Sequence, residues 1–258
     1  MFSTKNLLLM LILLVASECS SASVTIAGTR IVFPGDAREV SVRTTNKGTS
    51  PALVQVWIDD GKANENLDEV KTPFLVTPPI YRIEPGKGQS LRLMYNGLSL
   101  PQDRESVFWF NLLEIPPVSD TEKQGKNRLE LAFRTRIKVF YRPKALDSDS
   151  TEQFSRLNWA VTNDSGHGMG ITVTNPTPYY FSFDSGDAIR GGVKTRINMD
   201  MVAPGASQTF YAAKGGELSG EINKLTVKVI NDYGTAIEKT LIKQPGIGFK
   251  VVDAQVSR

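Results

Sequence analysis

Apolar and polar residues alternate along a long stretch near the middle of the chain, LELAFRTRIKVFYRP at residues 129–143. Every second position from Leu129 to Tyr141 is apolar except Thr135, and most positions between them are charged. A period of two residues predicts an extended β-strand and not a helix. Residues 129–140 would span roughly 40 Å, which is about twice the length of an ordinary strand. We therefore expect part of this strand to pair with another molecule.

Shorter runs of β-forming residues fill the rest of the chain and end at Gly, Pro, Asn or Asp residues. Before the long stretch they predict strands at 24–32, 39–45, 52–58, 74–77, 80–83, 89–95 and 107–115. After it they predict strands at 157–162, 170–174, 179–183, 195–202, 207–211, 224–230 and 235–242. Strands of this length, separated by such turn residues, indicate an all-β fold built from β-sandwiches.

The segments between the strands suggest how the chain is divided. No window has a helical period, although a single turn is expected at 101–104. The polar segment 116–128 predicts a loop that joins strand 107–115 to the long strand in an antiparallel hairpin. The run DSDS at 147–150 is the best candidate for a domain boundary. We expect an N-terminal domain at 23–145 and a C-terminal domain at 146–258, and 258 residues suffice for about two domains.

The first 22 residues have the pattern of a secretory signal peptide. Lys5 precedes an apolar run at 7–15, and small residues follow at 20–23, which predicts cleavage after Ala22 or Ser23. The apolar run is too short for a membrane span, so no stable membrane anchor is expected. Cys19 is the only cysteine and lies in the segment that would be removed. The exported chain would then contain no disulfide.

Composition and motifs exclude several classes of function. Apolar residues make up 40% and charged residues 22% of the chain, as in a soluble globular protein, and a net charge of +3 is too small to indicate nucleic-acid binding. The only histidine, His167, lies in a glycine-rich turn, so neither a catalytic site, a metal site nor a cofactor is expected. Asp59 is interpreted as a turn residue. Trp57, Trp109 and Trp159 lie within predicted strands and are expected in the cores.

Two cations, Arg30 and Lys138, lie within otherwise apolar strands. Each could lie on a solvated strand face. Alternatively, they could converge on an anion, because a guanidinium fork and an ammonium together suit a carboxylate. They are more than a hundred residues apart, so their spacing cannot show convergence.

Several segments, taken in order, resemble one known family. They are GTRIVFP at 28–34, VQVWID at 54–59, PFLVTPP at 73–79, FWFNL at 108–112 with IPP at 115–117, RIKVFYRP at 136–143, TNPTPYY at 174–180, VAPG at 202–205 and INDYG at 230–234. The set resembles the PapD-like periplasmic pilus (fimbrial) chaperones of Gram-negative bacteria. The short segment after Ile115 resembles the short-loop subclass of this family.

The resemblance implies two immunoglobulin-like β-sandwich domains in a boomerang arrangement, and a chaperone instead of an enzyme. Such a chaperone lends a strand to a pilus subunit that lacks its own last strand, and delivers the subunit to an outer-membrane usher without a cofactor. Leu129, Leu131 and Phe133 match the apolar donor residues. Phe133 is bulkier than the aliphatic residue expected there.

The resemblance also implies roles for charged residues in the cleft. Arg30 and Lys138 match the pair that anchors the C-terminal carboxylate of the subunit, and Thr29 flanks that site. Three further residues match those that bridge the two domains: Glu105, Arg142 and Asp232. Strict alternation places Lys138 on the opposite face of the strand from the donor residues, so either the strand twists or the two roles use different faces.

Two other functions remain open. The chain could be an exported two-domain adhesive or carbohydrate-binding module, which would expose Trp and Tyr on a binding face, or a chaperone for a surface fibre other than a pilus.

In the free chaperone, an exposed apolar strand edge would associate with itself. We therefore expect either a self-capping homodimer or a flexible loop in that region.

Overall fold

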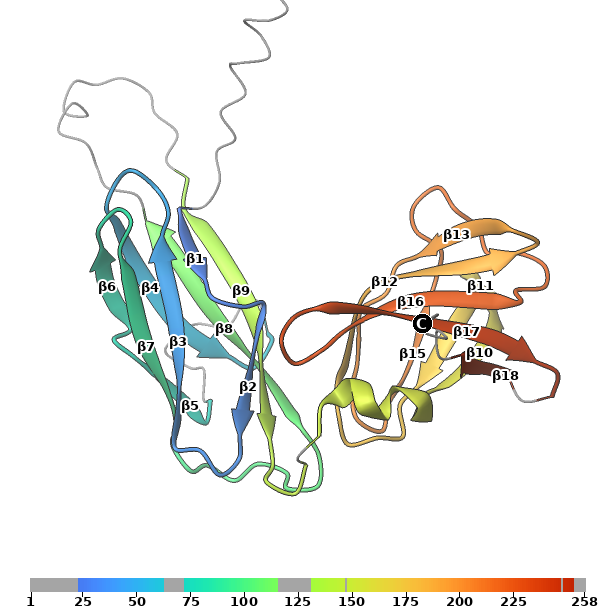
Figure 1. Cartoon of the computed structure of the whole chain (residues 1–258), viewed down its shortest axis with the longest axis horizontal. Coiled ribbons are helices and arrows are strands. Elements are labelled where there is room, and N and C mark those ends of the chain that lie inside the picture. The colour runs from blue at the N-terminus through green and yellow to red at the C-terminus, as the bar shows by residue number, and fades with distance from the viewer. Residues whose placement is uncertain (1–22, 63–71, 116–130, 147, 247, 253–258) are drawn as a thin grey trace, which may run out of the picture.

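Two β-sandwich domains make up the chain, as expected from the sequence. The computed structural model describes residues 23–62, 72–115, 131–146, 148–246 and 248–252. The predicted signal peptide, the predicted loop at 116–128 and the donor residue Leu129 lie outside the described residues. Figure 1 shows the two domains side by side in a boomerang arrangement, with the turn between β16 and β17 reaching toward the first domain.

The first domain contains two sheets. One sheet contains, in spatial order, β1 (Val24–Ile26), β3 (Glu39–Asn46), β7 (Gly88–Tyr95) and β5 (Phe74–Thr77). The other contains β2 (Arg30–Pro34), β9 (Phe133–Arg142), β8 (Ser106–Ile115), β4 (Ala52–Asp59) and β6 (Ile80–Ile83). The strands β8 and β9 are antiparallel, as the sequence predicts, whereas β2 and β9 are parallel.

The second domain follows a short 3-10 helix, η2 (Ser150–Arg156). One sheet contains β10 (Asn158–Asp164), β11 (Gly168–Thr174) and β15 (Ser207–Phe210). The other contains β13 (Val193–Ile197), β12 (Phe181–Arg190), β16 (Lys224–Ile230), β17 (Ala236–Gln244) and β18 (Gly248–Val252), and β14 (Met201–Val202) also pairs with β12.

Several elements differ from the prediction. The single strand expected at 24–32 is two strands in different sheets, because Gly28 adopts a φ of 90° that turns the chain from one sheet to the other. The strand expected at 195–202 is likewise divided between β13 and β14. The helix η2 was not predicted, because seven residues are too few to show a helical period; the side chain of Asp149 caps its N-terminus. The strand β18 was not predicted either. Residues 102–104 form bends, and no helical turn occurs at 101–104.

Each domain has its own apolar core. The first core is built around the fully buried residues Phe33, Val54, Leu91, Leu93, Phe110 and Val139. The second is built around Ile171, Val173, Phe181, Leu225, Val229 and Leu241. Trp159 lies in the second core as expected, but Trp57 and Trp109 are only half-buried and belong to neither core, so that expectation was wrong for both.

Strict alternation persists along β9. Its pairing with β8 runs from Phe133 to Tyr141 without a bulge. Ile137, Val139 and Tyr141 therefore point into the core, while Lys138 points away from it. Because Phe133 shares the core-facing side, this predicted donor residue and the predicted anchor residue Lys138 lie on different faces of one strand.

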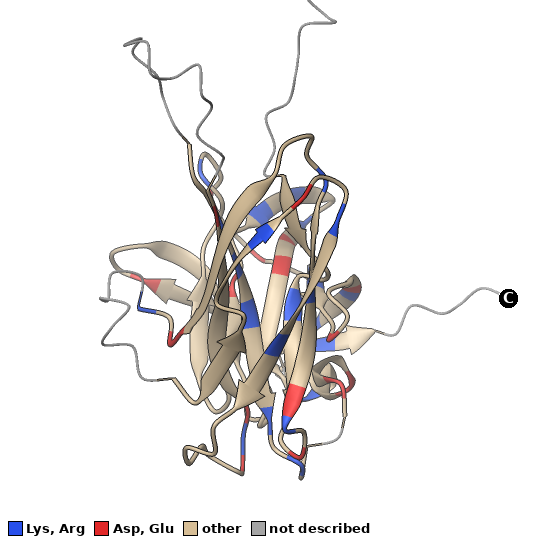
Figure 2. Ribbon diagram, turned by 90° about the vertical axis from the view of Figure 1, so that its left-hand side faces the viewer, with Lys and Arg blue, Asp and Glu red and all other residues tan. Residues whose placement is uncertain are grey.

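The described part of the chain offers no helix long and apolar enough to cross a membrane. Basic and acidic residues are interspersed along the strands seen in Figure 2, which agrees with the small net charge of +3.

Core packing in the first domain is testable at Leu91, which is fully buried on β7. Leu91→Ala should lower the free energy of unfolding by about 2–5 kcal/mol, because the substitution removes apolar contacts and leaves a cavity. Leu75→Ala, at a side chain that is 59% exposed, is the matched control and should change it by less than about 0.5 kcal/mol. Urea unfolding gives the free energy of unfolding of both variants. An equal decrease in the two would contradict the assignment of Leu91 to the core.

Candidate functional site

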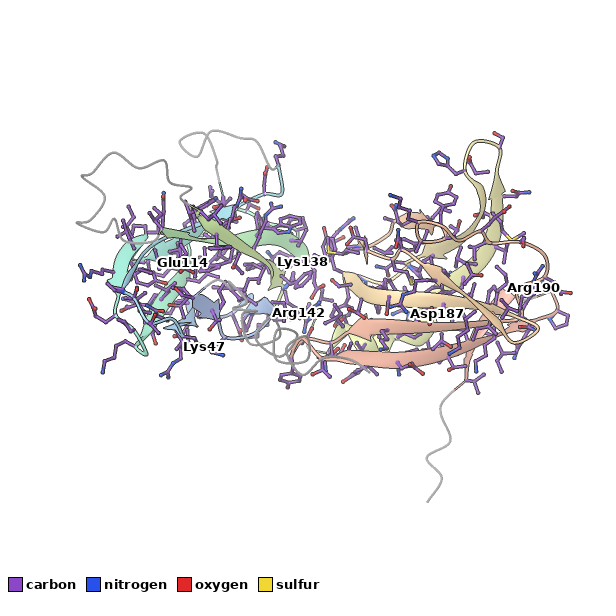
Figure 3. All side chains as sticks on the ribbon, turned by 90° about the horizontal axis from the view of Figure 1, so that it is seen from above. Lys47, Glu114, Lys138, Arg142, Asp187 and Arg190 are labelled. Atoms are coloured by element: carbon purple, nitrogen blue, oxygen red, sulfur yellow. The ribbon has the colours of Figure 1, made fainter. Side chains whose placement is uncertain are left out.

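Arg30 and Lys138 are direct neighbours in the structure. In the parallel pairing of β2 with β9, Arg30 lies opposite Lys138. Both side chains lie on the face turned away from the core, and Figure 3 shows Lys138 on the side of the first domain that faces the second. The convergence that spacing could not show is therefore present, and two cations share one small region.

The second domain supplies the polar groups around this pair of cations. The Nζ of Lys138 lies 3.8 Å from Asp200 Oδ1 and 3.5 Å from Ser182 Oγ. The Nη1 of Arg30 donates a hydrogen bond of 3.1 Å to the carbonyl oxygen of Ile230. Among the described residues, Lys138 thus has one long ion pair, with the exposed Asp200, and the hydrogen bond of Arg30 is to a neutral carbonyl group.

Burial makes both cations receptive to an anion. Partial burial lowers the pKa of Lys138, the charge of Asp200 opposes this shift, and the charge of Arg30 adds to it. Burial also lowers the pKa of Arg30, against the opposing charges of Asp232 and other carboxylates. The buried Nε of Arg30 has no hydrogen-bond partner within the described ranges. A bound anion would satisfy this donor and relieve the repulsion between the two cations.

Thr29 lies at the contact between the domains. Its side chain abuts Gly234, in the turn between β16 and β17, so closely that a Cβ atom at Gly234 would collide with Thr29 Oγ1. Gly234 also has a φ of 83°, which favours glycine. Thr29 precedes Arg30 in the sequence, and its described contact is with the second domain; its role beside the anchor stays a prediction.

Arg142 links the two domains through two carboxylates. Its Nε donates to Glu105 Oε1 at 2.8 Å, and its Nη1 and Nη2 form a bidentate pair with Asp232 at 2.5 and 2.8 Å. Glu105 also accepts a 2.7 Å bond from the backbone N–H of Tyr180. The three predicted bridging residues are therefore in contact, with Glu105 and Arg142 from the first domain and Asp232 from the second.

The environment of Arg142 favours its charged form. Burial alone would lower the pKa of Arg142, but the hydrogen bonds and charges of Asp232 and Glu105 outweigh burial and raise it. The guanidinium also lies 5.3 Å from the ring centre of Tyr179. Arg142 thus remains a cation at any physiological pH and holds both carboxylates.

The predicted donor residues lie at the start of β9 as far as they are described. Leu131 precedes β9 and its side chain is 53% exposed, and Phe133 is half-buried as the first residue of the strand. Phe133 lies opposite Glu114 of β8. Two apolar side chains thus continue the core-facing side of β9 beyond the packed part of the core.

One backbone edge of β9 is free along the same segment. From Phe133 to Ile137, β9 pairs with β8 on one side, whereas its pairing with β2 begins only at Lys138. No other described strand pairs with it there. The free edge therefore ends where Arg30 and Lys138 meet.

A buried ionic cluster on the outer face of β4, β8 and β9 was missed. Asp59 does accept a turn bond from the N–H of Gly61, but it is 3% exposed. Asn111 Nδ2 donates to Asp59 Oδ2 at 2.7 Å, and Arg134 Nη2 donates to the same oxygen at 3.3 Å. Arg136 forms a short ion pair with Asp59 Oδ1. The interpretation of Asp59 as a turn residue was therefore incomplete.

Two tryptophans complete this cluster. The guanidinium of Arg134 lies 5.0 Å from the ring centre of Trp57, and that of Arg136 lies 4.8 Å from Trp109. The alternation of Arg134 and Arg136 in the long strand could have indicated this cluster from the sequence, because two cations on one strand face need a nearby negative charge. The indole faces are covered by these cations.

No group of residues suited to a metal ion occurs in the described part of the chain.

Arg142 provides a test of the bridge between the domains. Arg142→Met should lower the free energy of unfolding by about 3–5 kcal/mol, because it leaves buried carboxylates without their cation. Adding Glu105→Gln to this variant should restore part of the loss, since one uncompensated charge is removed.

Arg43→Met, at an exposed position of β3, is the control for loss of an arginine and should be nearly neutral. Urea unfolding gives the free energy of unfolding of the single variant Arg142→Met, of the double variant with Glu105→Gln, and of Arg43→Met. A loss at Arg142 no greater than that at Arg43 would show that the bridge does not stabilise the chain.

Comparison with known proteins agrees with this architecture. Residues 23–147 match the family described as "Pili and flagellar-assembly chaperone, PapD N-terminal domain", and residues 152–241 match "Pili assembly chaperone PapD, C-terminal domain". The chain is 45% identical over 226 residues to the protein named "Probable fimbrial chaperone YadV" of Escherichia coli K12, covering 86% of this chain and 90% of that protein.

Further relatives extend the same likeness. The chaperone protein HifB of Haemophilus influenzae is 40% identical over 246 residues, which cover 93% of this chain and 97% of HifB. The crystal structure of the YadV chaperone superposes with a TM-score of 0.71 at 41% identity, covering 85% of this chain and 98% of that one. The crystal structure of the Pseudomonas aeruginosa CupB2 chaperone gives 0.69 at 36% identity, covering 84% and 98%. The chain therefore belongs to the PapD family of pilus-assembly chaperones, which are folding and assembly chaperones and not enzymes.

Proposed function

We propose that this chain binds pilus subunits by lending them the first part of β9, and that Arg30 and Lys138 hold the C-terminal carboxylate of the subunit. The observation that carries the proposal is the coincidence of two features: the free backbone edge of β9 ends at Lys138, where Arg30 lies opposite. A strand added to that edge would have its chain end at the two cations.

The chemistry of the anchor suits a chain end. A terminal carboxylate has two oxygens and one negative charge, which match a guanidinium fork and an ammonium. Charge-assisted hydrogen bonds contribute about 1.5–3 kcal/mol each. Arg30 and Lys138 are partly buried, Arg30 has only a neutral hydrogen-bond partner, and Lys138 has only a long ion pair with the exposed Asp200, which a bound carboxylate could replace.

The chemistry of the donor segment suits an incomplete sandwich. Leu131 and Phe133 continue the apolar face of β9, and Leu129 is the next residue in the same alternation. A subunit lacking its last strand has an apolar groove and open edges, which this strand would fill by β-augmentation. Phe133 is the bulkiest of the three, and we assign it to the widest part of the groove.

The remaining parts of the proposal follow from family membership and sequence. The chaperone acts in the periplasm after export by its predicted signal peptide, and delivers subunits to an outer-membrane usher. Its domains are divided at 145/146, between the two separate cores, and its short segment after Ile115 supports assignment to the short-loop subclass. In the free state, the exposed edge beside Leu131 is capped by a second copy of the chain.

The alternative of a carbohydrate-binding module has less support, since Trp57 and Trp109 are covered by arginines and Trp159 is buried.

The anchor is tested by substitution. Arg30→Ala and Lys138→Ala should each reduce recovery of the subunit at least tenfold without unfolding the chaperone, because each removes a charge-assisted contact to the chain end. Arg43→Ala, at an exposed position of β3, is the matched control and should leave recovery unchanged.

The measurement is a pull-down from periplasm with tagged chaperone, followed by mass spectrometry that identifies and quantifies the bound subunit. Circular dichroism checks the fold of each variant. Normal recovery with either variant would show that the anchor assignment is wrong.

The donor segment is tested at Leu131. Leu131→Asp should abolish recovery of the subunit, because a carboxylate cannot enter an apolar groove without a large desolvation cost. The side chain is already 53% exposed, so the free chaperone should keep its stability. Leu75→Asp, on the edge strand β5 and 59% exposed, is the control and should bind normally. Equal recovery with both variants would exclude this edge as the donor.

A further inference from the structure

Glu114 is a buried acidic residue that the proposed function does not use. It lies on β8, on the core-facing side with Phe110 and Leu112, and is 6% exposed. Figure 3 shows Glu114 within the first domain, away from Arg142 and from the second domain. Such a carboxylate is costly to bury unless it is hydrogen-bonded and paired with a cation.

The hydrogen-bond partners of Glu114 come from the first described residues of the chain. Ser23 Oγ donates a short hydrogen bond to Glu114 Oε1, and the N–H of Val24 donates to Oε2 at 2.9 Å. None of the lysines and arginines in the described ranges forms an ion pair with Glu114. Within the described residues, the partners of the carboxylate are thus neutral donors.

Ser23 is held in place by further contacts. Its carbonyl oxygen accepts a 2.7 Å hydrogen bond from the N–H of Lys47. Its Cβ lies against Gly48, where an added Cβ atom would be 2.5 Å away. Val24 then pairs with Asn46 at the start of β1. The structure therefore provides a defined place for Ser23 as well as for the strand that follows.

The structure assigns Ser23 as the first residue of the exported chain and Glu114 as the site that binds its α-ammonium group. The sequence predicts cleavage after Ala22 or Ser23. Hydrolysis of the Ala22–Ser23 bond by a signal peptidase consumes one water molecule, leaves a carboxylate on the released segment and creates an α-ammonium on Ser23. Cleavage after Ser23 would instead discard the contacts to Lys47, to Gly48 and to Glu114 Oε1.

The new charge would arise within reach of the carboxylate. Because Ser23 Oγ and the nitrogen of Val24 both contact Glu114, bond lengths keep the nitrogen of Ser23 within about 6 Å of it. Before cleavage this nitrogen belongs to a neutral amide. Removal of the signal thus supplies the missing cation, and the folded state of the processed chain gains an ion pair that the precursor lacks.

This site lies beside the free edge of β9. Glu114 is opposite Phe133 in the pairing of β8 with β9, and through Val24 it ties β1 to β8. Binding of the new chain terminus would therefore secure the end of the sandwich from which the donor segment leaves. The assignment itself stands on contacts within the first domain and does not require subunit binding.

A four-protein comparison tests the assignment. The exported chain is compared with the same chain carrying one extra glycine before Ser23, which moves the ammonium away while preserving the contacts of Ser23. Both are also made with Glu114→Gln. The extra glycine should lower the folding equilibrium constant about tenfold when Glu114 is present, as expected for a charge-assisted contact, and less than about twofold with Glu114→Gln. Urea unfolding at neutral pH gives the constants.

Two measurements do not depend on the Glu114→Gln variant folding. N-terminal sequencing of the periplasmic protein should find Ser23 first, and any other first residue would overturn the assignment. Acetylation of the α-amine, followed by mass spectrometry, should be at least tenfold slower for the exported chain than for the glycine-extended chain. Equal rates, or an equal effect of glycine in both backgrounds, would likewise overturn it.

Discussion

The unbroken alternation of β9 is the constraint on which the rest of the structure depends. Successive side chains of one strand point to opposite faces, so Ile137 and Val139 enter the core while Lys138 and Arg142 point away from it. A slip of one residue would bury cations and expose the core. The packing of the first domain therefore also fixes which residues meet the second domain and which are left at the free edge.

Much of the fold could be predicted because strand signals are local. The expected ranges 74–77, 80–83 and 224–230 coincide with β5, β6 and β16, since each is a short run rich in β-forming residues and bounded by turn residues. The hairpin of β8 and β9 followed from the same reasoning. The bridge between the domains was expected from likeness to a family, and the contacts of Arg142 agree with it.

The rest could not be predicted because it depends on contacts between distant residues. Nothing in the spacing of Arg30 and Lys138 shows that β2 and β9 pair in parallel with these two residues opposite each other. Asp59 looks like an ordinary turn residue until tertiary packing brings arginines from β9 beside it. A run that reads as one strand likewise divides at Gly28, since the pattern cannot say which sheet each half joins.

The ionic cluster around Asp59 has a consequence for selectivity. The outer face of β9 carries Arg134, Arg136 and Lys138 at alternate positions, and Arg30 lies beside the last of them. Asp59 pairs with the first two and compensates one of their two positive charges, and both guanidiniums also lie over indole rings. Attraction for anions is thereby weakened along the first part of this row of cations relative to its end at Lys138 and Arg30. If Arg30 and Lys138 hold a chain terminus as proposed, this partial compensation should favour a single terminal carboxylate over an extended polyanion, which would bind more strongly to an uncompensated row of cations.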